Sequence, residues 1–130
     1  MHFFFVYIIS IFFVNRANIA IFSFPFSALP LGNWSVSIGN TTATSIRISW
    51  QNLTPLLGRR IPHYIVLIKS TNGSILNGNI LPEDTASDAF HGLSPFAEYQ
   101  LSVVGANDEG GAYKSNEVAA WTDEGGTFSH

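Results

Sequence analysis

Short runs of alternating apolar and polar residues, separated by turn-forming residues, make up the chain from Gly32 onward. In residues 45–50, for example, Ile46, Ile48 and Trp50 share one face of an extended segment. A side-chain period of two is typical of a strand with one buried face, whereas no part of the chain keeps the period of 3.6 that marks an amphipathic helix. We therefore expect a fold built from strands.

Turn signals divide this part of the chain into seven expected strands. The segment at residues 63–69 is apolar on both faces, as in a central strand covered on both sides, and Asn72-Gly73 after it is a strong signal for a tight turn. The expected strands are residues 34–38, 45–50, 63–69, 74–81, 86–91, 98–106 and 113–122. Seven short strands at this spacing predict an all-β, antiparallel, immunoglobulin-like sandwich, with residues 51–62 as a loop.

Composition limits the partners of this domain. The 130 residues suffice for one domain, the formal net charge is −3, and only 12% of the residues are charged. The chain carries no basic patch for nucleic acid and no polybasic tract for anionic lipid, so we expect membrane contact only through a larger parent chain. Because it has no cysteine, it has neither disulfides nor a thiolate metal site.

No group of residues has the sequence spacing of a catalytic or metal-binding site. His63 and His91 lie within the domain, but no ligand motif joins them. The acidic pairs at residues 83–84 and 108–109 fit solvated loops better than a catalytic dyad or a calcium site. We therefore expect no enzymatic activity, no cofactor, no metal and no small-molecule substrate.

Residues 1–28 stand apart from the rest in composition. Residues 3–14 are apolar and uncharged, and they are too few to span a bilayer as a helix. Their length suits the apolar region of a signal peptide, although no lysine or arginine precedes it. A misassigned start and a buried strand or helix of the fold are the alternatives. In each case we place the segment outside the core fold, which then spans residues 31–122 and is followed by a polar tail at 123–130.

Four Asn-x-Ser/Thr sequons favour a secretory chain. They begin at Asn33, Asn40, Asn52 and Asn72, and none has proline in the middle position. All four fall in expected loops or at strand edges, where glycans are usually carried. We expect these asparagines as N-glycosylation sites, and we expect the protein outside the cell or at its surface.

Residues at particular positions resemble the fibronectin type III family. Trp50 closes the second expected strand, Tyr64 opens the third, and residues 93–99 read Leu-Ser-Pro-Phe-Ala-Glu-Tyr. The resemblance covers residues 31–122. It implies that Trp50 fills the space between the sheets and that the hydroxyl of Tyr99 bonds to the backbone upstream of it, as in a tyrosine corner. The implied structural core is Trp50, Tyr64, Leu93, Pro95 and Tyr99.

Three features depart from what the resemblance implies. Gly105 stands where the family usually has alanine, which weakens a strand slightly. Asp88 falls at an inward-facing position of the fifth expected strand. The loop at residues 107–111 lacks the Arg-Gly-Asp tripeptide of the integrin-binding members.

The resemblance implies a non-catalytic module for protein interaction or spacing in an extracellular adhesion protein or receptor ectodomain. Its partner would be another protein or a neighbouring module. The alternative is an accessory module of a larger secreted or membrane enzyme, such as a receptor tyrosine phosphatase, whose catalytic part lies elsewhere. Such modules usually place recognition on loops. The candidate contact residues, on the loops after the second, fourth and sixth strands, are Arg59, Arg60, Glu83, Asp84, Asp108 and Glu109.

Overall fold

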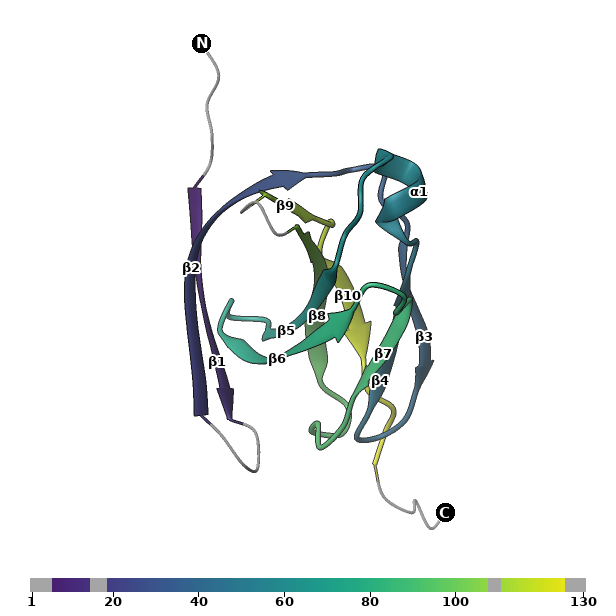
Figure 1. Ribbon diagram of the computed structural model, residues 1–130. Helices are drawn as coiled ribbons and strands as arrows, with labels where there is room; N and C mark the ends of the chain where they lie inside the picture. The colour runs from purple at the N-terminus through teal and green to yellow at the C-terminus, as the bar shows by residue number, and fades with distance from the viewer. Residues whose placement is uncertain (1–5, 15–18, 108–110, 126–130) are drawn as a thin grey trace, which may run out of the picture.

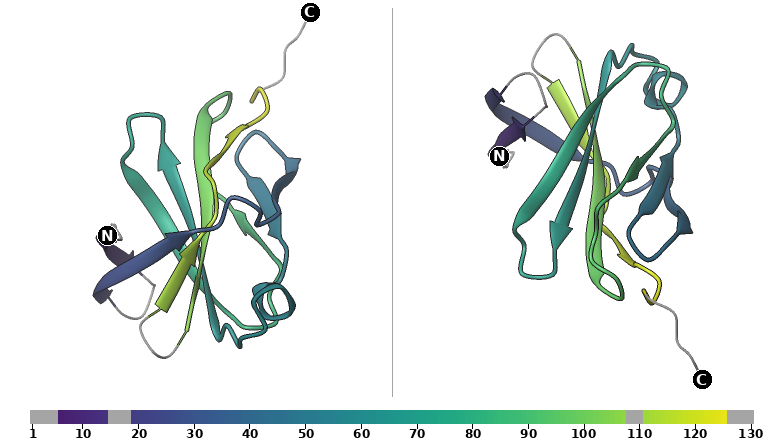
Figure 2. Two further views of the ribbon diagram at one scale, coloured as in Figure 1. Left: turned by 90° about the horizontal axis from the view of Figure 1, so that it is seen from above. Right: turned by 90° about the horizontal axis from the view of Figure 1, so that it is seen from below.

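The alternating runs form strands that lie in two sheets, packed face to face (Figure 1; Figure 2). The computed structural model describes residues 6–14, 19–107 and 111–125, and within them the chain has ten strands and one short helix. The predicted all-β sandwich is confirmed. The smaller sheet has the order β3–β4–β7, with β3 at Val36–Thr41, β4 at Ile46–Trp50 and β7 at Ser87–Phe90.

The larger sheet has the order β1–β2–β9–β8–β5–β6, and β10 pairs with β8 as well. Its pairs are antiparallel with one exception, β2 with β9, which is parallel. The expected antiparallel sandwich spanned residues 31–122, and every strand pair within the described part of that range is antiparallel; the parallel pair is made by β2, which precedes it. The strands of this sheet are β1 (Val6–Val14), β2 (Ile19–Pro30), β5 (His63–Ser70), β6 (Ile75–Pro82), β8 (Glu98–Ala106), β9 (Gly111–Lys114) and β10 (Val118–Trp121).

The last expected strand, residues 113–122, is in fact two strands, β9 and β10, which pair with opposite ends of β8. Ser115 lies between them and is buried. Its Oγ accepts a hydrogen bond from the N–H of Val103 at 2.9 Å, and its own N–H donates to the carbonyl of Val103 at 2.9 Å. The serine side chain thus supplies the acceptor that an unbroken strand would have supplied, so the buried backbone of β8 stays satisfied.

The expected loop at residues 51–62 contains a short helix, α1 (Leu53–Leu57). Asn52 caps its start, because the Oδ1 atom accepts a hydrogen bond from the N–H of Thr54 at 3.0 Å. Gly58 ends it in the left-handed conformation, with φ of 65°. A helix of this length is too short to show a helical period in the sequence, which is why a loop was expected.

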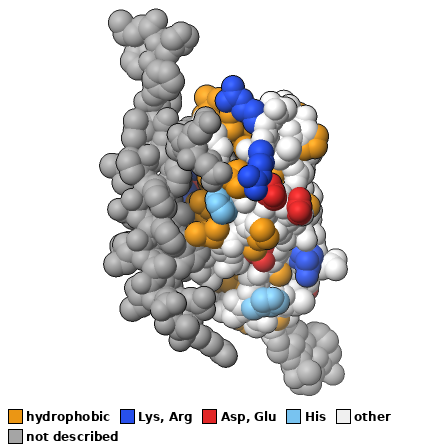
Figure 3. Space-filling model, viewed as in Figure 1, with side chains coloured by type: hydrophobic (Ala, Val, Ile, Leu, Met, Phe, Trp, Pro, Cys, Tyr) orange, Lys and Arg blue, Asp and Glu red, His pale blue; other side chains and the backbone are white. Residues whose placement is uncertain are grey.

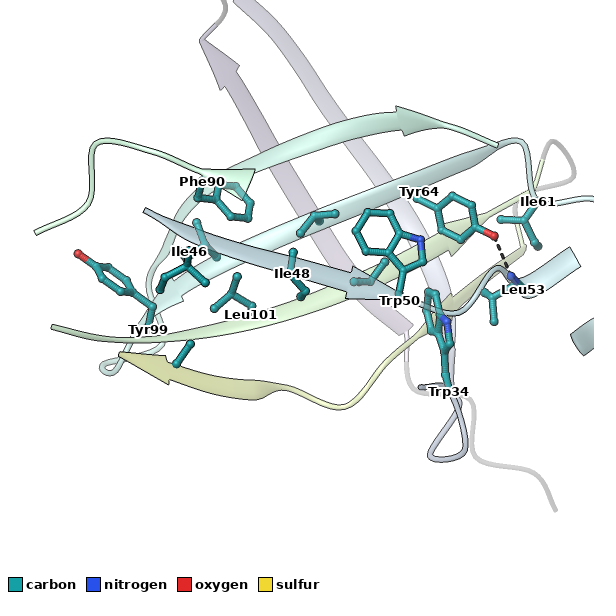
Figure 4. Close-up of a cluster of buried hydrophobic side chains, with 14 residues drawn as sticks. Trp34, Ile46, Ile48, Trp50, Leu53, Ile61, Tyr64, Phe90, Tyr99 and Leu101 are labelled. Carbon is teal, nitrogen blue, oxygen red and sulfur yellow. Dashed lines mark hydrogen bonds between the residues drawn. The ribbon is translucent and has the colours of Figure 1, made fainter. Parts of the chain in front are cut away.

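Three aromatic rings form one end of the core between the sheets (Figure 4). Trp50 and Trp34 both lie against Tyr64, with ring centroids 5.8 and 6.3 Å from it, and all three side chains are buried. The sequence did not single out Trp34, whose Nε1 donates to the carbonyl of Gln51 at 2.7 Å. Other buried side chains of this core are Ile46, Ile48, Leu53, Ile61, Val66, Ile68, Phe90, Tyr99, Leu101 and Val103.

Two buried tyrosines attach loops at opposite ends of the sandwich. The hydroxyl of Tyr64 accepts a hydrogen bond from the N–H of Leu53 at 2.8 Å. Burial raises the pKa of this hydroxyl above its ordinary value of 10.0, and the hydrogen bond from Leu53 partly opposes that rise. At the other end, the hydroxyl of Tyr99 accepts from the N–H of Ser94 at 2.9 Å. Each hydroxyl satisfies a backbone donor of the adjoining loop.

The turn before β8 is held by side chains other than its proline. Leu93 is half-buried and packs on the core, whereas Pro95 is exposed. Pro95 therefore shapes the turn from outside and does not belong to the buried core. Thr122 ties the turn down, since its Oγ1 accepts from the N–H of Ala97 at 2.9 Å and donates to the carbonyl of Ser94 at 2.6 Å.

The glycine at position 105 has a packing reason in this chain. A Cβ atom on Gly105 would lie 2.7 Å from the Cδ1 atom of Leu53 and 3.1 Å from the Cγ2 atom of Ile61. Leu53 belongs to α1 and is fully buried. The side chain of Leu53 therefore fills the space into which an alanine side chain at position 105 would project.

Enlarging this residue is expected to destabilise the fold. Gly105→Val should lower the free energy of unfolding by about 1–3 kcal/mol, because the added methyl groups would overlap Leu53. Urea unfolding of Gly105→Val, Leu53→Ala and the double variant measures this. The double variant should be more stable than the sum of the two single effects predicts, since it relieves the overlap. Strict additivity would show that the two residues do not compete for space.

Asp88 faces inward, as the sequence indicates. It lies opposite the buried Ile48 in the pairing of β4 with β7. Its Oδ2 atom accepts a hydrogen bond from the side-chain amide of Asn79 at 2.6 Å. Since Asn79 is on β6, this contact joins the edge strands of the two sheets and accounts for a half-buried carboxylate at the open side of the core.

The N-terminal segment forms strands in the structure. β1 and β2 pair with each other along their whole length, from Val6 opposite Ser27 to Val14 opposite Ile19. The end of β2, residues 27–30, pairs with β9. Among the described residues, β2 is hydrogen-bonded to the sandwich through its last part. The expectation that the domain folds without residues 1–28 stays a prediction.

Candidate interaction surface

Three loops meet at one end of the sandwich. His63, the first residue of β5, pairs with Pro82 on one side and with Ala106 on the other. The loop that contains α1 therefore ends between the loop after β6 and the loop after β8. The N–H of Asn107 donates to the carbonyl of Gly111 at 2.9 Å, which closes the base of the last loop.

An ion pair joins two of these loops. The Nε atom of Arg60 donates to the Oε2 atom of Glu83 at 2.7 Å, and its Nη2 atom donates to Oε1 at 3.1 Å. The hydrogen bond from Arg60 holds the pKa of Glu83 below its ordinary value of 4.5. Both side chains are well exposed, and such pairs contribute little to stability. The main effect of the Arg60–Glu83 pair is to hold the two loops in a fixed position relative to each other.

The other four candidate contact residues fall into two groups. Arg59 and Asp84 are exposed, and neither makes a hydrogen bond or ion pair in the part of the chain that the structure describes. Asp108 and Glu109 lie outside the described residues. Figure 3 shows basic and acidic side chains interspersed on one face of the molecule, with hydrophobic groups between them. The structure thus brings Arg60 and Glu83 together, and it leaves Arg59 and Asp84 available to a partner.

The exposed sequons are distributed over the two ends. Asn72 lies in the tight turn between β5 and β6, where its Oδ1 atom accepts from the N–H of Ser74 at 2.9 Å, and Asn40 lies near the end of β3. Both belong to the end opposite the three loops. Asn33 precedes the buried Trp34. The side chains of Asn33, Asn40 and Asn72 are all exposed.

Asn52 differs from the other three sequon asparagines because its amide is in use. Besides capping α1, its Nδ2 atom donates to the carbonyl of Glu83 at 3.1 Å. The hydroxyl of its sequon, Thr54 Oγ1, accepts from the N–H of Ile61 at 3.3 Å. Asn52 is half-buried, so a glycan on Nδ2 would compete with the contact to Glu83.

We expect a difference in glycan occupancy between these sites. In protein secreted by animal cells, Asn33, Asn40 and Asn72 should carry glycans, whereas Asn52 should be largely unmodified in the folded fraction. Peptide mass spectrometry after enzymatic deglycosylation in isotopically labelled water measures occupancy site by site. Equal occupancy at Asn52 would show that the cap and the contact to Glu83 form too late, or too weakly, to exclude the glycan.

A second group of charges lies beside the break between β9 and β10. The Nζ atom of Lys69 is 2.6 Å from the Oε1 atom of Glu117, and the Nζ atom of Lys114 is 3.7 Å from the same oxygen. The hydrogen bond from Lys69 lowers the pKa of Glu117 below its ordinary value of 4.5. These contacts tie β5 to the segment that connects β9 and β10.

The lowered pKa of Glu117 gives an acid dependence of stability. A carboxylate whose pKa is lower in the folded state stabilises the fold above its unfolded-state pKa, and this contribution is lost as pH falls through the folded-state value. Between about pH 6 and about pH 3, the urea midpoint of the wild type should fall more than that of Glu117→Gln. If the urea midpoints of the wild type and of Glu117→Gln fell equally with pH, the ion pair between Glu117 and Lys69 would not contribute to stability.

The two histidines of the domain lie at opposite ends. His63 begins β5 at the end with the three loops, and His91 follows β7 at the other. In the described residues, no group of three or more His, Asp or Glu side chains is arranged to hold a metal ion.

The one helix within the described residues, α1, has five residues, and the described part of the chain contains no helix with the length and hydropathy of a membrane span.

One exposed feature was not found from the sequence. The rings of Phe96 and Trp121 lie with their centroids 5.4 Å apart, and the two side chains are 64% and 51% exposed. Phe96 has a φ of 46°, which non-glycine residues rarely adopt. Its N–H donates to the carbonyl of Asp123 at 3.0 Å, which holds the turn in this conformation. Only the fold brings the two rings together, because they are far apart in the sequence.

The family of the chain is settled by a match to a model of the fibronectin type III domain, which covers residues 30–121. The chain belongs to the fibronectin type III family. Among solved structures, the fibronectin type III domain of human collagen XX is similar, with a TM-score of 0.60 and 21% identity over 79% of this chain and 100% of that chain. The FN5 domain of Drosophila Lar has a TM-score of 0.54 and 20% identity, over 75% of this chain and 99% of that chain.

Two curated relatives are much longer than this fibronectin type III chain. The MAM and fibronectin type III domain-containing protein 1 of Acropora millepora is 31% identical over 98 residues, which are 75% of this chain and 23% of that protein. The receptor-type tyrosine-protein phosphatase F of Danio rerio is 28% identical over 97 residues, which are 75% of this chain and 5% of that protein. The chain thus spans less than a quarter of the length of either relative.

Proposed function

We propose that this chain acts as a non-catalytic, extracellular module for protein interaction or spacing, within an adhesion protein or a receptor ectodomain. The observation that carries the proposal is the family match over residues 30–121, together with relatives in which such a module is a small part of a longer protein. Four sequons, three of them on exposed asparagines, are consistent with passage through the secretory pathway.

The end with the three loops is the proposed contact surface of the module. Loops held on a rigid sandwich are the usual place for recognition. There the pair between Arg60 and Glu83 fixes two loops relative to each other, and Arg59 and Asp84 extend into solvent. Once a partner is identified, reversing Arg59 and Arg60 to glutamate should slow association and change its salt dependence. An unchanged rate would exclude this end as an electrostatic contact.

The alternative is an accessory module of a larger secreted or membrane enzyme. It is favoured by the similarity to the receptor-type phosphatase F of Danio rerio and to the tyrosine-protein phosphatase Lar of Drosophila melanogaster. Extending the reading frame in both directions separates the two proposals, because an adjoining phosphatase domain would support the second.

Both proposals require the chain to enter the secretory pathway, and a secretion experiment tests this requirement. The full chain, expressed in animal cells with a C-terminal tag, should appear in the medium and should lose mass on enzymatic deglycosylation. A quadruple variant with Asn33, Asn40, Asn52 and Asn72 changed to glutamine is the control for that mass change. Retention of the unglycosylated chain in the cytosol would contradict an extracellular role.

A further inference from the structure

Two exposed aromatic rings adjoin each other at the end of the sandwich opposite α1, where β8 begins and β10 ends (Figure 1). Trp121 is the last residue of β10, and Phe96 lies two residues before β8. Their ring centroids are 5.4 Å apart, and both side chains are more than half exposed. A single exposed apolar residue needs no explanation, but two adjoining rings form a patch of the residue type that is enriched in protein interfaces. We call these two residues the aromatic patch.

Hydrogen bonds hold the two halves of the aromatic patch together. The N–H of Phe96 donates to the carbonyl of Asp123 at 3.0 Å, and the N–H of Thr122 donates to the carbonyl of Ala97 at 3.0 Å. The Oγ1 atom of Thr122 also accepts a hydrogen bond from the N–H of Ala97 at 2.9 Å. The turn that carries Phe96 is thus bonded to the residues that directly follow Trp121. A surface that is already ordered loses less conformational entropy when a partner binds to it.

A carboxylate lies beside the aromatic patch. Glu98 is directly opposite Trp121 in the pairing of β8 with β10, and opposite residues of an antiparallel pair project to the same side. Their neighbours Tyr99 and Ala120 belong to the core between the sheets, so Glu98 and Trp121 face away from the core. Glu98 is half-exposed, and it makes no ion pair within the described part of the chain. Its charge is therefore available to a cation that contacts the ring of Trp121.

The other charges around the aromatic patch add to this negative charge. Asp123 and Glu124 follow Trp121 closely in the chain, both are exposed, and neither forms an ion pair with another described residue. One cation, Lys69, projects from β5 on the side of Glu98, because it lies opposite Gln100 of β8. Its Nζ atom is 2.6 Å from the Oε1 atom of Glu117, so its charge is already balanced. The surroundings of the aromatic patch therefore complement a positively charged partner.

We propose that the aromatic patch binds an arginine side chain presented by a partner protein. A guanidinium group is planar and stacks on aromatic faces, of which that of tryptophan is the most favourable. Its N–H groups also bind a carboxylate in a bidentate manner, and Glu98 supplies that carboxylate beside Trp121. A lysine ammonium is more strongly hydrated and lacks the planar fork, so it fits this arrangement less well. The proposal goes beyond the proposed function, because this surface lies at the end opposite the three loops.

Titration of the full chain, labelled with nitrogen-15, tests the proposal by NMR. The probe is a tripeptide with a central arginine between two glycines, blocked at both ends. The chain has three tryptophans, and Trp34 and Trp50 are buried, so their indole N–H signals are internal references. We expect the indole N–H signal of Trp121 to shift progressively with peptide concentration while the other two stay in place. The same peptide with citrulline, which keeps the shape of arginine without its charge, should shift no indole signal.

Two substitutions separate the contribution of the ring from that of the carboxylate. Trp121→Leu keeps an apolar side chain but removes the aromatic face, and it should raise the dissociation constant of the arginine peptide about two- to fivefold. Glu98→Gln keeps the shape of the side chain but removes its charge, and it should raise the constant by about the same factor. Asp84→Asn, at an exposed acidic residue of the end with the three loops, is the matched control and should leave binding unchanged. Backbone amide signals far from the aromatic patch show that each variant is folded.

Three results would overturn the proposal. The first is an indole signal of Trp121 that does not move with the arginine peptide or moves equally with the citrulline peptide, and the second is binding that neither Trp121→Leu nor Glu98→Gln weakens. The third is self-association of the chain without peptide, measured by sedimentation velocity, that is lost in both Trp121→Leu and Arg59→Ala, since the patch would then bind a second copy. Secretion and glycan addition are measured separately, so a secreted, glycosylated chain that ignores the arginine peptide refutes this proposal and leaves the proposed function standing.

Discussion

Trp50→Ala is expected to lower the free energy of unfolding by about 3–5 kcal/mol, enough to unfold a module of ordinary stability. Trp50 is 5% exposed at the aromatic end of the core, and its ring lies 5.8 Å from that of Tyr64. Alanine would leave a cavity between two sheets whose hydrogen-bonded strands cannot close around it. Urea unfolding followed by circular dichroism measures the change.

Two further variants separate packing from polarity at this position. The Nε1 atom of Trp50 has no hydrogen-bond partner in the described part of the chain, so Trp50→Phe loses volume without losing a hydrogen bond. It should therefore be less destabilising than Trp50→Ala. Trp121→Ala is the matched control, because Trp121 is 51% exposed. Should Trp50→Ala leave the unfolding midpoint where the wild type has it, the assignment of Trp50 to the core would be refuted.

The strands of the sandwich could be predicted because their pattern is local. In β4 the alternation of Ile46, Ile48 and Trp50 is also the alternation of buried and exposed side chains. β8 has the predicted bounds, residues 98–106, since Tyr99, Leu101 and Val103 recur at every second position and share one face of the strand. The inward position of Asp88 followed from the same period of two.

The features that escaped prediction depend on contacts between distant residues. The break between β9 and β10 is possible because the Ser115 side chain replaces a backbone acceptor, and a serine in a strand-like run gives no sign of this. α1 is held by its cap and by Leu53, which fills the space above Gly105. β5 could be predicted only as a strand apolar on both sides, since the sequence does not say what covers its second side.

The candidate interaction surface was predicted only as a set of loops at one end. The sequence placed Arg60 and Glu83 on neighbouring loops, but their direct pairing depends on the lengths of both loops and on α1. It also treated the four sequons alike. Asn52 differs from the others because its amide caps a helix and bonds to a second loop, and both partners become visible only after folding.

Removing both tyrosine hydroxyls is expected to have the second large effect. Tyr64→Phe and Tyr99→Phe should each lower the free energy of unfolding by about 1–3 kcal/mol, because each leaves a backbone N–H, of Leu53 or Ser94, without its acceptor. The two hydroxyls attach different loops at opposite ends of the sandwich. Effects at distant sites without shared partners usually add, so the double variant should lose about 2–6 kcal/mol.

The double-mutant comparison also tests whether the two ends are independent. Urea unfolding of both single variants and of the double variant gives the three free energies, and hydrogen exchange at Leu53 and Ser94 reports whether each amide has lost its protection. We expect Tyr64→Phe to expose the amide of Leu53 alone, and Tyr99→Phe that of Ser94 alone. If either substitution increased exchange at both amides, the loops would be coupled through the core. Binding of a partner at the end with the three loops would then affect the opposite end, where Asn40 and Asn72 lie.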